Sequence, residues 1–547
     1  MKRVRQFPDV TVLAFHDDIS LVAPVRQLDS VLRWSQEHLR RIGAKLQLAK
    51  CTILHHPEVV SEVAQQPNLA SLARTTEGLC LHGVPMGTTT YVAQQTRRLP
   101  LEHERLIEGI LRLSADALPQ QLCLFRYCAS GRSTYLLRAL DAAAGAVLAR
   151  EVDARSLQVL SRICGPLHDH PLLSAGDAKL VQTQIQLPCR WGGLGFSSQA
   201  RIQPAAAVDA WLQLFRGPLA DLTPTLRLKQ LLLNTADPAT SPTTLTALAA
   251  EIRHLLRTVS ENLPADCSPS VARTTTWDGL LNQICAQRPT PPTETTADDP
   301  PRPLTRAQRA FANVLHCVAY QDIIDYPTVP AYARSRLRSA TAGASATWFR
   351  DIPSASATFV TTQQLITNIR QLLGVPLTAH RPSEPCSSCR HTHDVYGYQL
   401  LHRCSRSTRM RIHRHNELVR TVARLLRGWG FTDVVVEPGP MSEETPQREP
   451  DIQAIHPRTH RTLFFDVVVT SPFLTRRFQR TAARMGCAAN TAAQRKMHKY
   501  SGIVTDPEDF VPIAIETYGR LATRTMADLR RLTRHLDSDF TILSRAI

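Results

Sequence analysis

Two aspartates in apolar surroundings constrain this chain more than any other feature. Asp451 precedes the apolar segment 452–455, and Asp466 interrupts the apolar run 462–469. A polar stretch rich in His, Pro and Arg separates the two segments, so the pattern predicts paired strands joined by a turn. A carboxylate among apolar side chains is costly to bury unless it is paired or binds a cation. We therefore expect two neighbouring carboxylates that hold a divalent cation.

Lys496 and Lys499 follow further along the chain, about one turn apart on one face of a predicted helix. Two carboxylates with a nearby lysine suit phosphodiester hydrolysis, because bound Mg²⁺ lowers the pKa of a water and neutralises phosphate charge. This arrangement resembles the PD-(D/E)xK nuclease fold. Val468 stands where that pattern has its lysine, so Lys496 or Lys499 would have to supply it. The alternative is a β-hairpin with an Asp at a strand end and a surface lysine pair.

Charge and cysteine usage narrow the classes of partner. The chain of 547 residues has 64 basic and 47 acidic residues and a net charge of +17, which favours polyanionic partners such as nucleic acid. No N-terminal signal peptide is predicted, and no stretch reaches the roughly 20 apolar residues of a membrane span. The thirteen cysteines are scattered apart from one close pair, which is typical of an intracellular protein with reduced thiols and one metal site.

A second pair of aspartates, Asp17 and Asp18, lies near the N-terminus. The segment Val10–Ala23 predicts a hairpin that displays both at its tip. Adjacent carboxylates at a hairpin tip bind Mg²⁺ in template-directed polymerases, although an Asp-Asp turn also occurs by chance. The elements expected next are an amphipathic helix over 29–42, a strand over 45–54 and a short strand pair over 77–87.

The pattern from 100 to 180 is helical. In a polymerase this region would be the thumb, whose basic helix follows the duplex backbone, and Arg126, Arg132 and Arg138 are candidates for that role. The alternative for each is ordinary helical packing with a solvated arginine.

A glycine-rich turn at 187–196 follows, and it lacks the G-x-G-x-x-G spacing of a dinucleotide loop. Beyond it the sequence predicts helices over 245–259 and 306–320. A Pro- and Thr-rich linker from 286 to 304 separates them. We find no chemistry in this part of the chain.

Cys386 and Cys389 form a Cys-x₂-Cys knuckle, with His402 and Cys404 downstream. These ligand types suit tetrahedral Zn²⁺. A single residue separates His402 from Cys404, so their joint ligation is not assured. The other candidates for the fourth ligand are His391, His393 and His413. The alternative is a pair of chance thiols in a loop.

The C-terminal pattern predicts an α/β domain around the two strand aspartates. A helix over 411–426 and a strand over 433–437 come before them, and a strand over 510–517 and a helix over 526–536 follow the lysine pair. A helix, strands carrying Asp451 and Asp466, and then a lysine-bearing helix is the element order of the nuclease fold named above.

The joint order of these motifs resembles the C-terminal part of a non-LTR retrotransposon polyprotein that carries a restriction-enzyme-like endonuclease. Phe15-His16-Asp17-Asp18 matches the aromatic-x-Asp-Asp motif of a reverse-transcriptase palm, and segment 187–196 matches one found after the thumb. The resemblance covers about 1–200 and 380–520. In that family the endonuclease nicks one strand of the target DNA, and the exposed 3′-OH primes reverse transcription of the element RNA. It implies DNA and RNA as partners and a nuclear location.

The resemblance also implies roles for single residues. Asp451 and Asp466 would be Mg²⁺ ligands, and Lys499 or Lys496 the displaced catalytic lysine. The auxiliary residues would be His415 and Glu417. Asp17 and Asp18 would be a remnant Mg²⁺ site, because the third palm aspartate and the fingers precede this hairpin in the family. We expect no polymerisation by this chain alone, and a second chain would have to supply the missing palm and fingers.

The fold class expected is a multidomain mixed α+β protein. Its parts are a partial palm (1–95), a helical thumb-like region (96–215), a helical connector (216–380), a zinc knuckle (381–410) and an α/β restriction-endonuclease-like domain (411–547). Two alternatives to a working endonuclease stay open: a non-catalytic nucleic-acid-binding relic of a retrotransposon, and a decayed fragment that folds poorly.

Overall fold

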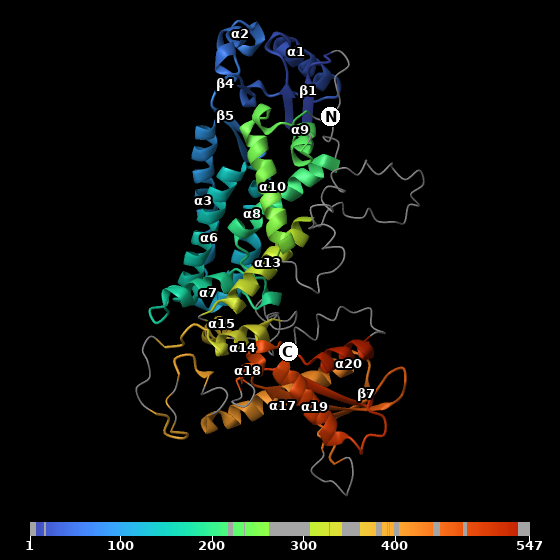
Figure 1. The fold of residues 1–547 in the computed structure, drawn as a ribbon. Coiled ribbons are helices and arrows are strands. Elements are labelled where there is room, and N and C mark those ends of the chain that lie inside the picture. The colour runs from blue at the N-terminus through green and yellow to red at the C-terminus, as the bar shows by residue number, and fades with distance from the viewer. Residues whose placement is uncertain are drawn as a thin grey trace. The chain divides into compact units, whose positions relative to one another are not determined.

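The computed structural model describes residues 7–15, 18–216, 223–234, 236–261, 307–327, 329–341, 361–378, 385–390, 392, 394–398, 404–440, 449–473 and 478–533 (Figure 1). These residues form helices and small sheets, which confirms the mixed α+β class. None of the described helices combines the length and apolarity needed to cross a membrane. The linker predicted at 286–304 lies outside the described residues.

The chain divides into two compact units, each assembled from three stretches. The first unit comprises 1–105, 132–152 and 199–314, and the second comprises 106–131, 153–198 and 315–547. The five consecutive domains expected from the sequence stay a prediction.

The N-terminal hairpin of the first unit is confirmed. Strands β1 (Thr11–Phe15) and β2 (Asp18–Val22) pair antiparallel, with Phe15 opposite Asp18. The amphipathic helix α1 (Val25–Arg41) follows and begins four residues earlier than expected. Its buried Leu32 packs in a small apolar cluster of this unit.

The strand expected over 45–54 is wrong over most of its length. Residues Leu48–Lys50 form a 3₁₀ turn, and only β3 (Thr52–Leu54) is extended. The partner of β3 is the parallel strand β4 (Ala73–Thr75), which has three residues, so the ladder has nothing to pair with further upstream. Leu48 packs against the apolar cluster from the turn instead.

The short strand pair is confirmed as β5 (Gly78–Leu81) and β6 (Val84–Gly87), and the helical pattern after it is confirmed as well. The helices that follow are α3 (Thr89–Leu111), α4 (Leu118–Leu124), α5 (Thr134–Ala139), α6 (Ala142–Cys164), α7 (Ala175–Ile185), α8 (Gln199–Arg216), α9 (Thr223–Leu232), α10 (Thr243–Glu261), α13 (Ala307–Asp325), α14 (Ala331–Ala340) and α15 (Thr362–Leu373).

The glycine-rich turn belongs to the second unit and is a packing element. A Cβ on Gly193 would lie 2.1 Å from the carbonyl oxygen of Leu187, so the close backbone approach requires glycine. Gly192 and Gly195 both have φ of +76°. Leu194 and Phe196 of this turn are buried in the helical core of the unit. The turn therefore fixes the chain path between helices.

The C-terminal part of the second unit is a four-stranded sheet with helices (orange to red in Figure 1). The strand order is β10 (Phe510–Glu516), β9 (Thr462–Thr470), β8 (Ile452–Ile455) and β7 (Thr432–Val436). Strands β7, β8 and β9 pair antiparallel, and β9 and β10 pair parallel. The helices are α17 (Thr408–Gly428), α18 (Phe478–Ala483), α19 (Cys487–Tyr500) and α20 (Thr523–Thr533). The element order expected around the two aspartates is confirmed.

Helix α19 crosses from β9 to its parallel neighbour β10, and a buried carboxylate fixes its start. Glu516 at the end of β10 is 2% exposed. Its Oε1 accepts hydrogen bonds from the backbone N–H groups of Ala488 (3.0 Å) and Ala489 (3.2 Å) in the first turn of α19. A negative charge at this position also complements the helix dipole.

Glu516→Ala is expected to lower the free energy of unfolding by about 2–3 kcal/mol, because two buried N–H groups lose a charged acceptor. Glu516→Gln keeps an acceptor oxygen and loses only the charge, so about 1 kcal/mol is expected. Calorimetric Tm values of the full chain would rank the variants. Equal Tm values for the wild type and Glu516→Ala would contradict this role. An exposed matched position, Glu417→Ala, serves as the control.

Candidate active site

Asp451 and Asp466 lie beside each other at the centre of the C-terminal sheet. Asp451 stands one residue before β8, and Ile452 pairs with Phe465, so the register brings Asp451 next to Asp466 on β9. The Oδ2 atom of Asp451 accepts a hydrogen bond from the backbone N–H of Val467 at 2.6 Å. That bond fixes the carboxylate of Asp451 against the neighbouring strand.

Asp466 is the more buried of the two, with a side chain 2% exposed. Its Oδ1 accepts a hydrogen bond from Nζ of Lys496 on α19 at 2.6 Å. Its Oδ2 is buried and accepts no hydrogen bond of ordinary geometry within the described part of the chain, although the nearby Tyr500 hydroxyl lowers the pKa of Asp466. A buried carboxylate oxygen without a partner carries a desolvation cost that a bound cation would offset.

The two carboxylates differ in their electrostatic surroundings. Burial raises the pKa of Asp466 above its ordinary value, the Lys496 charge opposes that rise, and the Asp451 charge adds to it. Burial would also raise the pKa of Asp451, but the hydrogen bonds from His415 and from Val467 N–H outweigh it and lower that pKa. Asp451 is therefore the carboxylate held more firmly in its ionised form.

The helix α19 directs its two lysines to different partners. Lys496 binds Asp466, and its side chain is 25% exposed. Nζ of Lys499 lies 3.2 Å from the hydroxyl of Tyr500 and 4.8 Å from the centre of the Tyr500 ring. The Tyr500 hydroxyl donates to the carbonyl oxygen of Glu449 at 2.6 Å. Lys499 therefore lies near the backbone just before Pro450. Among the described residues, Lys496 is the one of the two lysines that contacts a carboxylate.

The two residues expected to be auxiliaries, His415 and Glu417, have different partners in the structure. His415 on α17 approaches Asp451, with its Nε2 3.3 Å from Oδ1. The hydrogen bond to Asp451 raises the pKa of His415 despite its partial burial. Glu417 points elsewhere and binds Arg420 with a 2.5 Å contact on the exposed side of α17. His415 is therefore part of the carboxylate site, and Glu417 does not contact it.

Tyr500 is a site residue that the sequence did not single out. It is 1% exposed, stacks on Phe510 with ring centroids 4.4 Å apart, and ties the end of α19 to Glu449. Its position directly after Lys499 was the only signal, and nothing in the sequence indicates that its hydroxyl reaches the Pro450-Asp451 turn. Burial raises the pKa of Tyr500, so the hydroxyl stays a hydrogen-bond donor.

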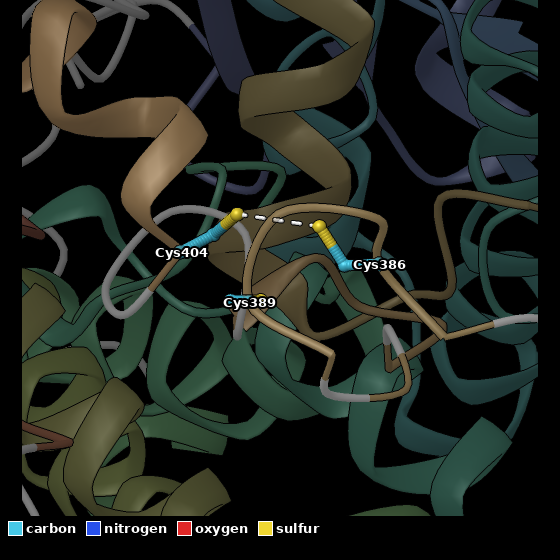
Figure 2. Close-up of side chains that lie close together, drawn as sticks. All are labelled: Cys386, Cys389 and Cys404. Carbon is cyan, nitrogen blue, oxygen red and sulfur yellow. Dashed lines mark hydrogen bonds between the residues drawn. The ribbon is translucent and has the colours of Figure 1, made fainter.

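Three cysteines form a second site. The Sγ atoms of Cys386, Cys389 and Cys404 all lie within 4.8 Å of one another, and those of Cys386 and Cys404 are 3.6 Å apart (Figure 2). Cys386 and Cys404 are buried. Backbone N–H groups of Cys389 and Ser388 lower the pKa of Cys386 to about 6, which favours the thiolate. These three side chains could hold a metal ion.

Of the histidines proposed as the fourth ligand, His391, His393 and His402 lie outside the described residues. His413 is described, is exposed on α17, and does not belong to the cysteine group. Within the described ranges, this is the one set of three or more potential ligand side chains so close together.

The N-terminal candidates are placed in part. Asp18 is 69% exposed, and its Oδ2 lies 3.5 Å from Nδ1 of His82 in the turn between β5 and β6. Asp17 lies outside the described residues.

The three candidate arginines have different surroundings. The guanidinium of Arg126 donates to the Leu194 carbonyl and lies 5.2 Å from the centre of the Phe196 ring, in the glycine-rich turn. Arg138 donates from Nε to Gln308 at 2.9 Å, and Arg132 is exposed. Their contact with a nucleic-acid backbone stays a prediction.

No protein-family model and no curated protein matches this chain. The assignments above therefore rest on the geometry of the site.

Proposed function

We propose that this chain is a retrotransposon-derived protein whose C-terminal sheet carries a Mg²⁺-dependent DNA endonuclease. Its activity would be to nick target DNA and so prime reverse transcription of an element RNA. The observation that carries the proposal is the buried Oδ2 of Asp466, which accepts no hydrogen bond of ordinary geometry in the described part of the chain and lies beside Asp451.

The residues present fit a hard divalent cation. Mg²⁺ takes oxygen ligands and is held in proteins by one or two carboxylates with water and substrate phosphate. Asp451 and Asp466 would supply those carboxylates. When bound, Mg²⁺ would lower the pKa of a water and neutralise charge on the scissile phosphate.

The other residues would prepare this pair for the reaction. Val467 N–H and His415 orient Asp451 from two sides, which fixes one carboxylate before substrate arrives. Lys496 contacts Asp466, and a quarter of its side chain is exposed. Its ammonium group can stabilise negative charge that develops on the phosphate.

The cysteine site would hold Zn²⁺ in a structural role. Zn²⁺ prefers thiolate and imidazole ligands in tetrahedral geometry, and Cys386, Cys389 and Cys404 supply three thiols. The fourth ligand would come from outside the described residues, and His402 is the first candidate.

We expect about one zinc per chain in the purified protein, because three convergent thiols bind zinc far more tightly than scattered ones. Cys404→Ser should lose the metal, as measured by elemental analysis, and should lower Tm. The matched control is Cys80→Ser, which changes an exposed thiol outside the group. Equal zinc content in the two variants would rule out this site.

A second candidate function is non-catalytic nucleic-acid binding. The Lys496–Asp466 ion pair favours it, because the ammonium group neutralises the more buried carboxylate without a metal ion. The net charge of +17 would supply salt-sensitive binding to the nucleic-acid backbone. Polymerisation is not part of either proposal.

Nicking of supercoiled plasmid by the full chain, with Mg²⁺ or with EDTA, separates the two functions. Nicked circles that form only with Mg²⁺ support the endonuclease. Salt-dependent DNA binding by a folded, zinc-loaded chain, with no nicked product, supports the binding protein instead.

A further inference from the structure

Helix α17 joins the cysteine site to the carboxylate site. Cys404 stands directly before the turn Ser405–Ser407 that leads into α17. The carbonyl oxygen of Cys404 accepts three hydrogen bonds: from Ser407 N–H (3.1 Å), from Ser407 Oγ (2.8 Å) and from Nη1 of Arg411 (3.1 Å). The backbone of a cysteine in the cluster is therefore fixed to the first turns of the helix.

Arg411 and His415 are four residues apart, so they lie on the same face of α17, one turn after the other. Arg411 binds the helix start through Ser407 Oγ at 2.7 Å and Thr408 Oγ1 at 2.9 Å, in addition to Cys404. His415 approaches Asp451 from the next turn, at 3.3 Å. The path from the cysteine cluster to Asp451 therefore runs along one helix face.

Within the described part of the chain, few buried apolar side chains hold this half of the helix in place. The buried residues of α17 are Val419, Val422, Ala423 and Leu426, all beyond His415. Met410 and Ile412 in the first half are 66% and 56% exposed. A helix end without buried apolar side chains frays unless polar contacts fix it. Among the described residues, the polar contacts of this half include those that Ser407 and Arg411 make with Cys404.

We propose that a metal ion held by Cys386, Cys389 and Cys404 positions the first half of α17 and so orients His415 on Asp451. The cysteine site thereby sets the divalent-cation affinity of the carboxylate pair, which rests on the proposed function of that pair. His415 is a positioning residue in this scheme: it contacts the carboxylate and fixes its orientation. Without the cysteine-bound metal the first turns of α17 fray, and Asp451 loses one of its two orienting partners.

The test measures Mn²⁺ binding to the full chain by the electron paramagnetic resonance signal of free Mn²⁺. Mn²⁺ prefers oxygen ligands, so it probes the carboxylates and not the thiols. Mn²⁺ binding to the Asp466→Asn variant gives the background from other sites on the chain, which is subtracted. We expect removal of zinc to weaken carboxylate-dependent Mn²⁺ binding about tenfold, a typical coupling between two sites. In His415→Ala the same removal should change the affinity little, because the coupled contact is already gone.

Arg411→Gln tests the path without touching a thiol. It should keep one zinc per chain and still weaken Mn²⁺ binding several-fold. Arg424→Gln, an exposed arginine on the same helix that binds Thr421 Oγ1, is the matched control and should leave both metals unchanged. Equal Mn²⁺ affinity with and without zinc, or an equal loss in wild type and His415→Ala, overturns the proposal. Failure of the endonuclease site has a separate signature, because the zinc-loaded wild type would then bind no more Mn²⁺ than Asp466→Asn, and the coupling would fall with it.

Discussion

Asp466→Asn is expected to abolish Mg²⁺-dependent nicking, with a loss of about a thousandfold or more in rate at saturating DNA. Asparagine has nearly the shape of aspartate, but it replaces one oxygen of the carboxylate by an amide nitrogen that cannot bind a cation. The oxygen at stake is Oδ2, which is buried and accepts no hydrogen bond of ordinary geometry from the described residues. Removing the charge also turns the 2.6 Å ion pair with Lys496 into a hydrogen bond to a neutral oxygen.

Asp451→Asn should cause a loss of similar size, since Asp451 is the second carboxylate of the pair. Asp506→Asn is the matched control, because Asp506 lies in the same part of the chain but pairs with Arg461. The rates are compared only among variants that keep the wild-type Tm and zinc content. Wild-type nicking by Asp466→Asn would remove the basis of the proposed endonuclease.

Most of the secondary structure follows from the sequence, because apolar periodicity depends on local burial. The apolar run around Asp466 predicts β9, and the spacing of apolar residues after Arg411 predicts α17. The exception at 45–54 has a physical reason: a strand exists only as far as a partner pairs with it, and β4 is three residues long. A pattern within one segment carries no information about the length of its partner.

The proximity of Asp451 and Asp466 depends on strand register, which the sequence restricts but does not specify fully. Ile452 pairs with Phe465, and a shift by one residue would turn the apolar side chains of β8 to the other face. The apolar pattern therefore favours the observed register, and with it the contact between the two carboxylates. The spacing of the cysteines likewise predicts the grouping of Cys386, Cys389 and Cys404. No comparable pattern indicates that Tyr500 reaches Glu449, because that contact joins two segments through tertiary packing.

The choice between Lys496 and Lys499 depends on packing in the same way. Both lie on α19, about 60° apart around the helix axis, so either can face the carboxylates as far as the sequence is concerned. The rotation of α19 about its own axis decides which lysine faces the carboxylates. Buried alanines fix that rotation, because Ala489, Ala492 and Ala493 pack with Ala514 on β10. That orientation brings Lys496 to Asp466 and leaves Lys499 on Tyr500.

Lys496→Met is therefore expected to lower the maximal nicking rate about a hundredfold, and Lys499→Met to leave it nearly unchanged. Methionine keeps much of the apolar stem and removes the charge, so packing of α19 is affected little. Rates are measured at saturating DNA, so that a lost phosphate contact at Lys499 does not appear as a lost rate. A larger loss for Lys499→Met than for Lys496→Met would show that Lys499, and not Lys496, is the catalytic lysine.

The nicking rate of Lys496→Met, measured against Mg²⁺ concentration, also separates the two proposed functions. Removing the ammonium group leaves Asp466 with two oxygens and an uncompensated charge, so the pair should bind Mg²⁺ at least as tightly as before. A catalytic lysine therefore predicts a lower maximal rate with no rise in the Mg²⁺ concentration needed for half of it. If Lys496 only neutralises Asp466 in a binding protein, the variant gains affinity for the cation and neither protein cleaves DNA. The cation affinity stays the same or increases in both cases, so the cleavage rate distinguishes a catalytic lysine from a structural ion pair.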